Sequence, residues 1–329
     1  MKKNWFLVIA VLVCFFILSH SHVWSADKIV IRWGDVLSSA HPSVKMVEMN
    51  AQKISQRTNG RIEIQCYPAG QLGGSRDMIE AVANGMQEMV TEGAANFGQW
   101  VPSIGVIEAP YIWRGIDHLN KVMSGPLGEE FNKQLIEKRG MRILGTTYYG
   151  VRQLTTTNKM VKSVSDMANF KLRVPENEVF MAMAKAWGAK PTPINFNELW
   201  LALKQNVVDG EENPLPTIDS GKFYEVQKYL ILTAHILTPR LVVVNENFWK
   251  KIPAPEQKIL KNTVMEGIQW NNEQILAREK ELLDRFRAQG MIVVEPNIEE
   301  FRKAVLDTVP KQFEAKWGKD TWEKIQAVK

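Results

Sequence analysis

Residues 255–288 are the stretch that most constrains the fold of this 329-residue chain. After Pro255 the stretch contains no proline and only one glycine, Gly267, and its helical character is continuous. A helix of this length extends about 50 Å, since each residue adds about 1.5 Å. One α/β lobe is shorter than that, so we expect the helix to pack across two lobes.

Two α/β units precede this helix. The first alternates strands at 28–33, 61–66 and 87–91 with helices at 42–57 and 75–83, the second of them with Ser75 as its N-cap. This order predicts a parallel-type sheet. The second unit has strands expected at 171–174, 190–193 and 207–209, and helices at 178–187 and 195–205.

The connections between the units indicate that neither lobe is one contiguous segment. Extended runs at 141–149 and 151–157 meet at Gly150, further strands are expected at 229–233, 241–245 and 291–294, and two helices close the chain. The expected fold class is therefore α/β with two lobes and a long helix spanning both. We expect lobe I to comprise residues 26–150 and 239–277, and lobe II residues 151–238 and 278–329.

The N-terminus has the pattern of an export signal. Lys2 and Lys3 precede an apolar run at 5–18, which is shorter than the roughly 20 residues of a membrane span and fits a secretory signal peptide. Ser25 before Ala26 suits cleavage, so residues 1–25 are expected to be removed. An uncleaved anchor is the alternative. The prediction is an exported, periplasmic protein.

Composition narrows the function. Only Cys66 remains after removal of the signal, so no intramolecular disulfide can form and the core must hold the fold. The formal net charge of +5 is scattered, with no run of more than two Lys or Arg residues. This pattern argues against nucleic acid and suits a small anion.

No enzyme or metal signature is visible in the sequence. The nucleophile elbow, the zinc-protease pattern, the phosphate loops and the C-x-x-C pair are all absent. His41, His118 and His235 stand in unrelated contexts, without the convergent ligands that a metal needs. We expect a protein that is not an enzyme and has neither cofactor nor metal. The carboxylates to suspect first for a hard cation are Asp209, Glu211 and Glu212.

Four segments occur together in an order typical of one family. They are residues 58–62 (TNGRI), 70–73 (GQLG), 171–175 (KLRVP) and 207–214 (VVDGEENP). In this combination the chain resembles the solute-binding proteins of TRAP (tripartite ATP-independent periplasmic) transporters. The resemblance implies the two-lobe fold of periplasmic binding proteins, with a small carboxylate ligand held between the lobes.

The resemblance also implies which residues bind the ligand. Arg173 matches the guanidinium that clamps the carboxylate, Arg152 matches a second arginine, and Asn213 matches an amide that completes the carboxylate's hydrogen bonds. A guanidinium suits this task because its planar fork of donors pairs with a carboxylate bidentately. The structural alternatives are a surface ion pair for Arg173, a hinge salt bridge for Arg152 and a turn for Asn213.

Other candidates come from positions near these motifs. Phe196 is a candidate aromatic floor, with ordinary core packing as its alternative. Glu92 ends a strand and could orient an arginine or accept from a ligand hydroxyl. His41, Tyr149 and Trp187 complete the candidate ligand-binding set. Glu211 departs from the family, in which glutamine is frequent, and this leaves the ligand open.

The sequence therefore predicts an extracytoplasmic, monomeric binding protein that delivers an organic acid to a TRAP-type membrane permease. A dicarboxylate, a hydroxy or keto acid, a sugar acid and a sulfonate all remain open as ligands. The rival functions are a secreted α/β enzyme acting on a small organic acid and a module that senses the same solute.

Overall fold

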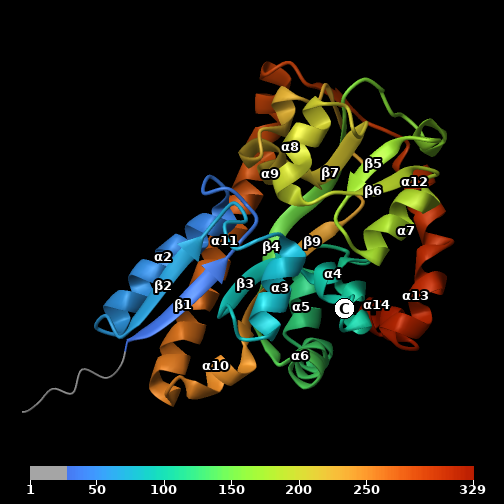
Figure 1. Cartoon of the computed structure of the whole chain (residues 1–329). Coiled ribbons are helices and arrows are strands. Elements are labelled where there is room, and N and C mark those ends of the chain that lie inside the picture. The colour runs from blue at the N-terminus through green and yellow to red at the C-terminus, as the bar shows by residue number, and fades with distance from the viewer. Residues whose placement is uncertain (1–27) are drawn as a thin grey trace, which may run out of the picture.

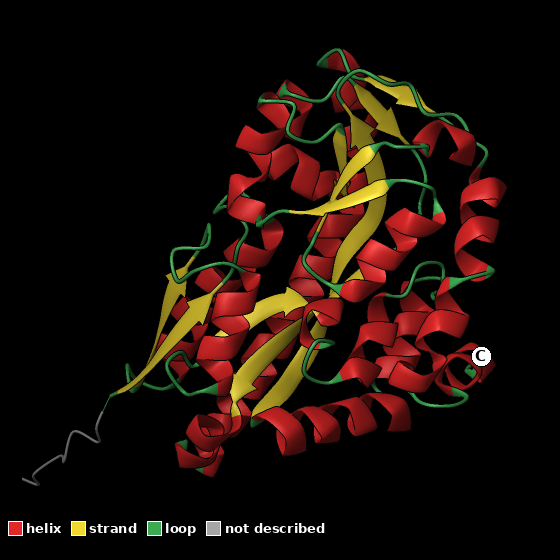
Figure 2. Ribbon diagram, turned by 45° about the vertical axis from the view of Figure 1, so that its right-hand side comes forward, coloured by secondary structure: helices red, strands yellow, loops and turns green. Residues whose placement is uncertain are grey.

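The computed structural model describes residues 28–329, and the expected signal peptide at 1–25 lies outside them. Two α/β lobes stand one above the other, and the long helix α11 (Ala254–Ala288) runs behind both (Figures 1 and 2). None of the helices within residues 28–329 is long and apolar enough to span a membrane.

The lower lobe in Figure 1 opens with the expected strand–helix alternation. Its strands β1 and β2 are parallel, as are β1 and β3, whereas β3 pairs with the returning strand β9 in antiparallel fashion. The elements of this lobe are β1 (Ile29–Gly34), α2 (Pro42–Arg57), β2 (Ile62–Tyr67), α3 (Ser75–Ala83), β3 (Met89–Gly93), α4 (Ala94–Phe97), the 3-10 helix η1 (Pro102–Glu108), α5 (Ile116–Met123), α6 (Pro126–Arg139) and α10 (Glu246–Lys251).

The upper lobe is built around a second sheet. Strand β5 is parallel to both of its neighbours, β6 and β7. The elements are η2 (Val164–Met167), β5 (Lys171–Val174), α7 (Glu178–Ala186), β6 (Lys190–Pro193), α8 (Phe196–Lys204), β7 (Gly210–Pro214), α9 (Leu215–Ser220), η3 (Phe223–Glu225), β8 (Tyr229–Ile231) and β10 (Ile292–Val294).

Two strands cross between the lobes. Strand β4 (Met141–Thr156) is one 16-residue strand where the sequence indicated two runs. Its first part pairs with β9 (Leu237–Asn245) and its last part with β7 and β8, all antiparallel. The register shifts between Tyr148 and Gly150, and Gly150 has a φ of 122° that favours glycine. The β4 backbone therefore changes sheets at Gly150.

Helix α11 contacts both lobes, as its length indicated. In its first half, Glu266 pairs with Arg57 of α2, and near its end Arg285 pairs with Asp219 of α9. Gly267 lies against α2, since a Cβ there would lie 2.4 Å from the Asn50 side chain. This contact explains the single glycine of the helix.

Three further expectations about local structure were wrong. The expected strand at 207–209 is a bend, and β7 begins at Gly210. Gly210 packs closely against β4, because a Cβ at this position would lie 2.1 Å from the Thr155 carbonyl oxygen. The N-cap of α3 is Gly74, because Asp77 accepts a hydrogen bond from its N–H. Three helices rather than two close the chain, namely α12 (Ile298–Leu306), α13 (Val309–Trp317) and α14 (Thr321–Ala327).

The closing helices run along one side of the molecule, from the upper lobe to the lower (Figure 1). Trp187, just after α7, donates to the Phe301 carbonyl of α12, while His118 of α5 lies 2.9 Å from the Ile325 carbonyl of α14. The C-terminal segment therefore contacts both lobes. The division of the chain into lobes at 150/151, 238/239 and 277/278 stays a prediction.

Candidate functional site

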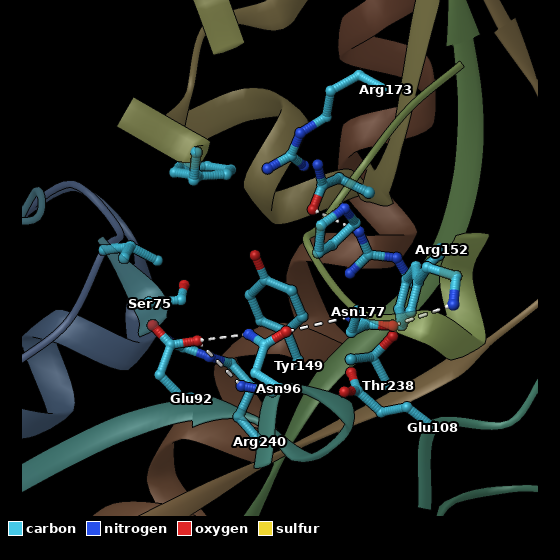
Figure 3. A pocket seen from close by; sticks show the side chains of 16 residues that line it. Ser75, Glu92, Asn96, Glu108, Tyr149, Arg152, Arg173, Asn177, Thr238 and Arg240 are labelled. Atoms are coloured by element: carbon cyan, nitrogen blue, oxygen red, sulfur yellow. Dashed lines mark hydrogen bonds and ion pairs between the residues drawn. The ribbon is translucent and has the colours of Figure 1, made fainter. Parts of the chain in front are cut away.

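A small cavity of about 60 Å³ lies where the two lobes meet. Figure 3 shows Arg173 at one end of it, Glu92, Asn96 and Arg240 at the other, and Tyr149 between them. The lining residues are Val36, Ser75, Glu92, Gly93, Asn96, Glu108, Tyr149, Arg152, Arg173, Pro175, Asn177, Phe180, Phe196, Asn213, Thr238 and Arg240.

Arg173 brings a buried guanidinium to the cavity without a carboxylate partner. Strand β5 carries the residue, whose side chain is 3% exposed. Its Nε and Nη2 donate to the Ile194 carbonyl at 2.9 and 2.7 Å, and among residues 28–329 no acidic side chain forms an ion pair with it. Burial lowers the pKa of Arg173 to about 10. The group is still a cation at neutral pH, and its charge is not neutralised by direct contact.

Arg152 lies beside it but has a carboxylate partner. Its Nε and Nη2 bond to the Glu212 carboxylate, which also lies 3.0 Å from His235 Nε2. The Glu212 carboxylate holds the pKa of Arg152 above its ordinary value despite burial. Nη2 also donates to Asn213 Oδ1 at 3.0 Å, so Arg152 orients the Asn213 amide.

Asn213 and Phe196 surround Arg173. Asn213 is 2% exposed and ends β7, beside β5 in the same sheet. The Phe196 ring, at the start of α8, lies 5.9 Å from the Arg173 guanidinium carbon. This end of the cavity therefore has two guanidinium groups, an amide and an aromatic face.

The opposite end belongs to the lower lobe and contains carboxylates. Glu92 is 2% exposed and accepts from Asn96 Nδ2 at 3.1 Å through Oε2, while its buried Oε1 has no hydrogen-bond partner within residues 28–329. Burial raises the pKa of Glu92. Burial also raises the pKa of Glu108 to about 7.

Arg240 is the third cavity arginine and the one that the sequence reasoning missed. It pairs bidentately with Asp35 at 2.8 and 2.9 Å, and Glu92 Oε1 lies 3.9 Å from its Nη2. Asp35 holds the pKa of Arg240 above its ordinary value despite burial. The centre of the Tyr149 ring lies 5.3 Å from the guanidinium carbon of Arg240. Arg240 is therefore neutralised by the protein, in contrast to Arg173.

Six of the eight candidate ligand-binding residues line this one cavity: Arg173, Arg152, Asn213, Phe196, Glu92 and Tyr149. His41 and Trp187 do not, contrary to expectation. His41 is fully buried at the N-cap of α2, where Nδ1 accepts from Ser43 N at 3.0 Å. Trp187 packs edge-on against His235 in the core of the upper lobe. Both side chains are occupied by structural contacts.

Of the missed polar lining residues Arg240, Glu108 and Asn177, all but one had no local sequence signal. Arg240 and Asp35 are 205 positions apart in the chain, and Glu108 and Asn177 are a single acid and a single amide outside the recognised motifs. Asn177 could have been found as a helix N-cap, since its Oδ1 accepts from Phe180 N at 3.0 Å.

The suspected carboxylate trio does not converge. Asp209 accepts from the Lys171 backbone, Glu212 pairs with Arg152, and Glu211 bonds to Thr155. Within the described part of the chain no group of three or more His, Cys, Asp or Glu side chains is arranged to hold a metal ion.

The mouth of the cavity is bridged from lobe to lobe. Asn177 Nδ2 donates to Asn96 Oδ1 at 3.1 Å, and Arg76 lies 3.8 Å from Glu176. Gly70 of the lower lobe lies so close to Asn197 that a Cβ would come within 2.1 Å of its amide. The lobes are therefore in direct contact around the cavity.

Comparison with known proteins gives consistent matches. The family model described as "Bacterial extracellular solute-binding protein, family 7" matches residues 33–316. The sialic acid-binding periplasmic protein of Vibrio cholerae is 34% identical over 291 residues, covering 87% of this chain and 90% of that protein.

Solved structures agree with this sequence relationship. A TRAP periplasmic solute-binding protein from Polaromonas sp. JS666, bound to D-erythronate, is 32% identical with a TM-score of 0.85 over 92% of this chain and 99% of that one. Another from Roseobacter denitrificans, bound to 3-deoxy-D-manno-oct-2-ulosonic acid (KDO), is 29% identical with a TM-score of 0.87 over 92% and 100%. The expected family and two-lobe fold class are confirmed.

Proposed function

Because the chain belongs to the bacterial extracellular solute-binding proteins of family 7, we propose that it captures a small organic acid between its lobes for a TRAP transporter. The observation that carries this proposal is the Arg173 guanidinium. It is buried at the wall of a cavity and forms no ion pair with a carboxylate of residues 28–329. A buried cation is stabilised by a carboxylate that accepts two hydrogen bonds from its fork.

The ligand carboxylate takes its place against Arg173, Arg152 and Asn213. The Glu212 carboxylate already neutralises Arg152, so the site as a whole retains one unneutralised guanidinium at this end. A single carboxylate of the ligand therefore neutralises the Arg173 guanidinium. Phe196 covers one side of this anchor and excludes water from it.

The rest of the ligand carries hydroxyl groups. Glu92 Oε1 is buried with no hydrogen-bond donor among the described residues, and Asn96 and Asn177 add amides nearby. A ligand hydroxyl can donate to Glu92, whereas a second carboxylate would be repelled by it. Erythronate, KDO and sialic acid, which the relatives bind, are hydroxylated acids. We propose this class in preference to simple dicarboxylates.

The ligand stabilises contact between the lobes. Arg173 and Asn213 stand on the upper lobe and Glu92 on the lower, so one molecule bonds to all three only when the lobes are together. We propose a hinge near Gly150, where the pairing of β4 with β9 shifts register, and near Thr238 of β9. The predicted lobe boundaries follow from these crossing points.

We extend the proposal to the export, oligomeric state and partners of the protein. The protein is exported to the periplasm with residues 1–25 removed as a signal, acts as a monomer, hands the acid to a membrane permease, and does not convert it. Nucleic acid has no part in this function.

A thermal-shift panel tests the proposal. D-erythronate, KDO, sialic acid and succinate are each added at increasing concentration to the mature protein. A ligand at 100 times its Kd stabilises the folded state by about 2.7 kcal/mol, so a hydroxylated acid should raise the midpoint while succinate does not. NMR of each stabilising acid after hours with the protein should show it unchanged. Failure of every acid to shift the midpoint, or formation of a product, would reject the binding-protein reading.

A further inference from the structure

Glu211 is a buried acid behind the cavity wall that takes no part in the site described above. It is 0% exposed and lies in β7, opposite Thr155 of β4. Its Oε1 is 2.6 Å from Thr155 Oγ1, and its Oε2 accepts from Asn213 Nδ2 at 2.6 Å. Glu211 thus touches a residue of the cavity wall without lining the cavity.

The hydrogen bonds around Glu211 form a chain whose direction can be worked out. Gln227 Nε2 faces the Val226 carbonyl at 2.9 Å and Thr157 Oγ1 at 2.8 Å. Two facing carbonyl oxygens would repel each other, so the Val226 contact fixes Nε2 on that side. Gln227 Oε1 therefore faces Thr155 Oγ1, at 3.2 Å.

The far end of the chain is fixed in the same way. Asn213 Oδ1 accepts from Arg152 Nη2 at 3.0 Å, so Nδ2 is the atom that faces Glu211. Arginine has no acceptor, which excludes the flipped amide.

Thr155 then has two acceptors and one proton. Its hydroxyl cannot donate to both Glu211 Oε1 and Gln227 Oε1. If Glu211 is a carboxylic acid, its O–H donates to Thr155 Oγ1, and the Thr155 hydroxyl donates onward to Gln227. If Glu211 is ionised, its carboxylate accepts the hydrogen bond of the Thr155 hydroxyl. The buried Gln227 oxygen then loses its donor.

We infer that Glu211 is held in this fold as a neutral carboxylic acid, and that it is a positioning residue that fixes the orientation of the Asn213 amide in the cavity wall. The charged groups that act on it are Glu212 of its own strand, Arg152 of β4 and Arg173 of β5. Burial is the larger influence, and it raises the pKa of Glu211 to about 7.

A consequence for binding rests on the proposed function. Ionisation of Glu211 places a second buried negative charge, in addition to that of Glu212, beside the anchor for the ligand carboxylate. Affinity for the acid should then fall as the pH rises above about 7, in proportion to the protonated fraction.

The inference is tested first without ligand. The Asn213 side-chain amide is followed by ¹⁵N–¹H NMR from pH 5.5 to 9 and assigned by its loss in Asn213→Ala. In wild type the chemical shift of this amide should change in a single titration step centred near pH 7. In Glu211→Gln, where the amide donates to Thr155 and the oxygen accepts from Asn213, it should not shift.

Glu108→Gln is the matched control, because Glu108 also has a pKa near 7 and lines the cavity. This variant should retain the Asn213 step. An Asn213 amide that does not move with pH in wild type, or that moves equally in Glu211→Gln, overturns the inference.

The ligand experiment then separates this inference from the proposed function. Titrations with D-erythronate and KDO at pH 6 and 8.5 should show up to about 30-fold weaker binding from the ionisation of Glu211 in wild type at the higher pH, and a clearly smaller loss in Glu211→Gln, in which Glu108 still ionises. Equal wild-type affinities at both pH values would contradict the coupling to ligand. If neither acid binds at pH 6, the result counts against the proposed function for this class of acid, while the NMR step alone decides the state of Glu211.

Discussion

Asn177 Nδ2 donates a hydrogen bond to Asn96 Oδ1 at 3.1 Å, and this bond joins the two lobes at the mouth of the cavity. The Asn177 Oδ1 of the same amide caps α7 by accepting a hydrogen bond from Phe180 N. One side chain thus starts a helix in the upper lobe and contacts the lower lobe.

Asn177→Ser should weaken ligand binding about 2- to 10-fold, because a serine still caps the helix but no longer reaches Asn96, and a hydrogen bond contributes about 0.5–1.5 kcal/mol. Calorimetry measures the change. Arg76→Ala is the control, since the exposed Arg76–Glu176 contact at 3.8 Å should contribute less. A larger effect of Arg76→Ala than of Asn177→Ser would contradict the role given to Asn177.

Gly150→Ala should lower the free energy of unfolding by about 1–3 kcal/mol. At a φ of 122°, the new Cβ would lie 2.7 Å from Pro214 Cβ and 3.0 Å from Glu279 Oε1. Denaturant unfolding checks this value. Gly290→Ala is the control: Gly290 has a positive φ of 93°, and a Cβ there would have no atom within 4 Å. This variant therefore reports backbone strain alone and should lower the free energy of unfolding by less. Equal losses in the two variants would mean that close packing at the crossing strand is unimportant.

Two of the three buried cavity arginines, Arg240 and Arg173, should respond differently to the same substitution. Arg240→Met leaves the buried Asp35 unpaired and should cost about 3–5 kcal/mol of stability. Arg173→Met removes a buried charge that has no ion-pair partner in residues 28–329, so it should leave the ligand-free stability within about 1 kcal/mol or raise it. Urea unfolding of both variants without ligand compares them. A severe loss in Arg173→Met would show that its charge is compensated within the protein.

Glu108 should make stability depend on pH. Its pKa rises to about 7 on folding, so between about pH 4.5 and 7 the folded state binds a proton that the unfolded state has lost. Stability therefore falls as the pH rises through this window, by about 3 kcal/mol for this group. Unfolding at pH 5 and 7.5 should show a smaller fall in Glu108→Gln, whose side-chain oxygen still accepts from Ala95 N. An equal fall in the free energy of unfolding between pH 5 and 7.5 in wild type and Glu108→Gln would contradict this role of Glu108.

The sequence predicted the fold and brought Arg173 and Asn213 to one cavity wall, because both depend on local patterns. Helix Pro42–Arg57 and strand Lys171–Val174 have the predicted bounds, and Arg173 and Asn213 stand in motifs that could be recognised as such. The strand at Gly210–Pro214 was misplaced because two consecutive glutamates read as a solvent-exposed turn. In the fold, Glu211 and Glu212 are buried by bonds to Thr155 and Arg152, some 56 to 60 positions earlier.

Long-range pairing explains most of what the sequence did not show. Nothing near Arg240 in the sequence indicates that Asp35 will pair with it, and nothing near Trp187 indicates that the Phe301 carbonyl will accept its hydrogen bond. The contact of His41 with Ser43 is local and makes His41 the N-cap of α2. A sequence gives the donors and acceptors of each side chain, whereas the tertiary fold decides which of them remain free for a ligand.

The central claim is that Arg173 anchors a carboxylate, and calorimetry of Arg173→Lys tests it most directly. The titrant is the acid of the panel, among D-erythronate, KDO and sialic acid, that stabilises wild type most. Lysine keeps the charge but loses the bidentate fork, and an imperfectly paired buried charge costs about 3–5 kcal/mol, so affinity should fall by two to four decades. An Arg173→Lys protein that binds the acid within about threefold of wild type would contradict the account.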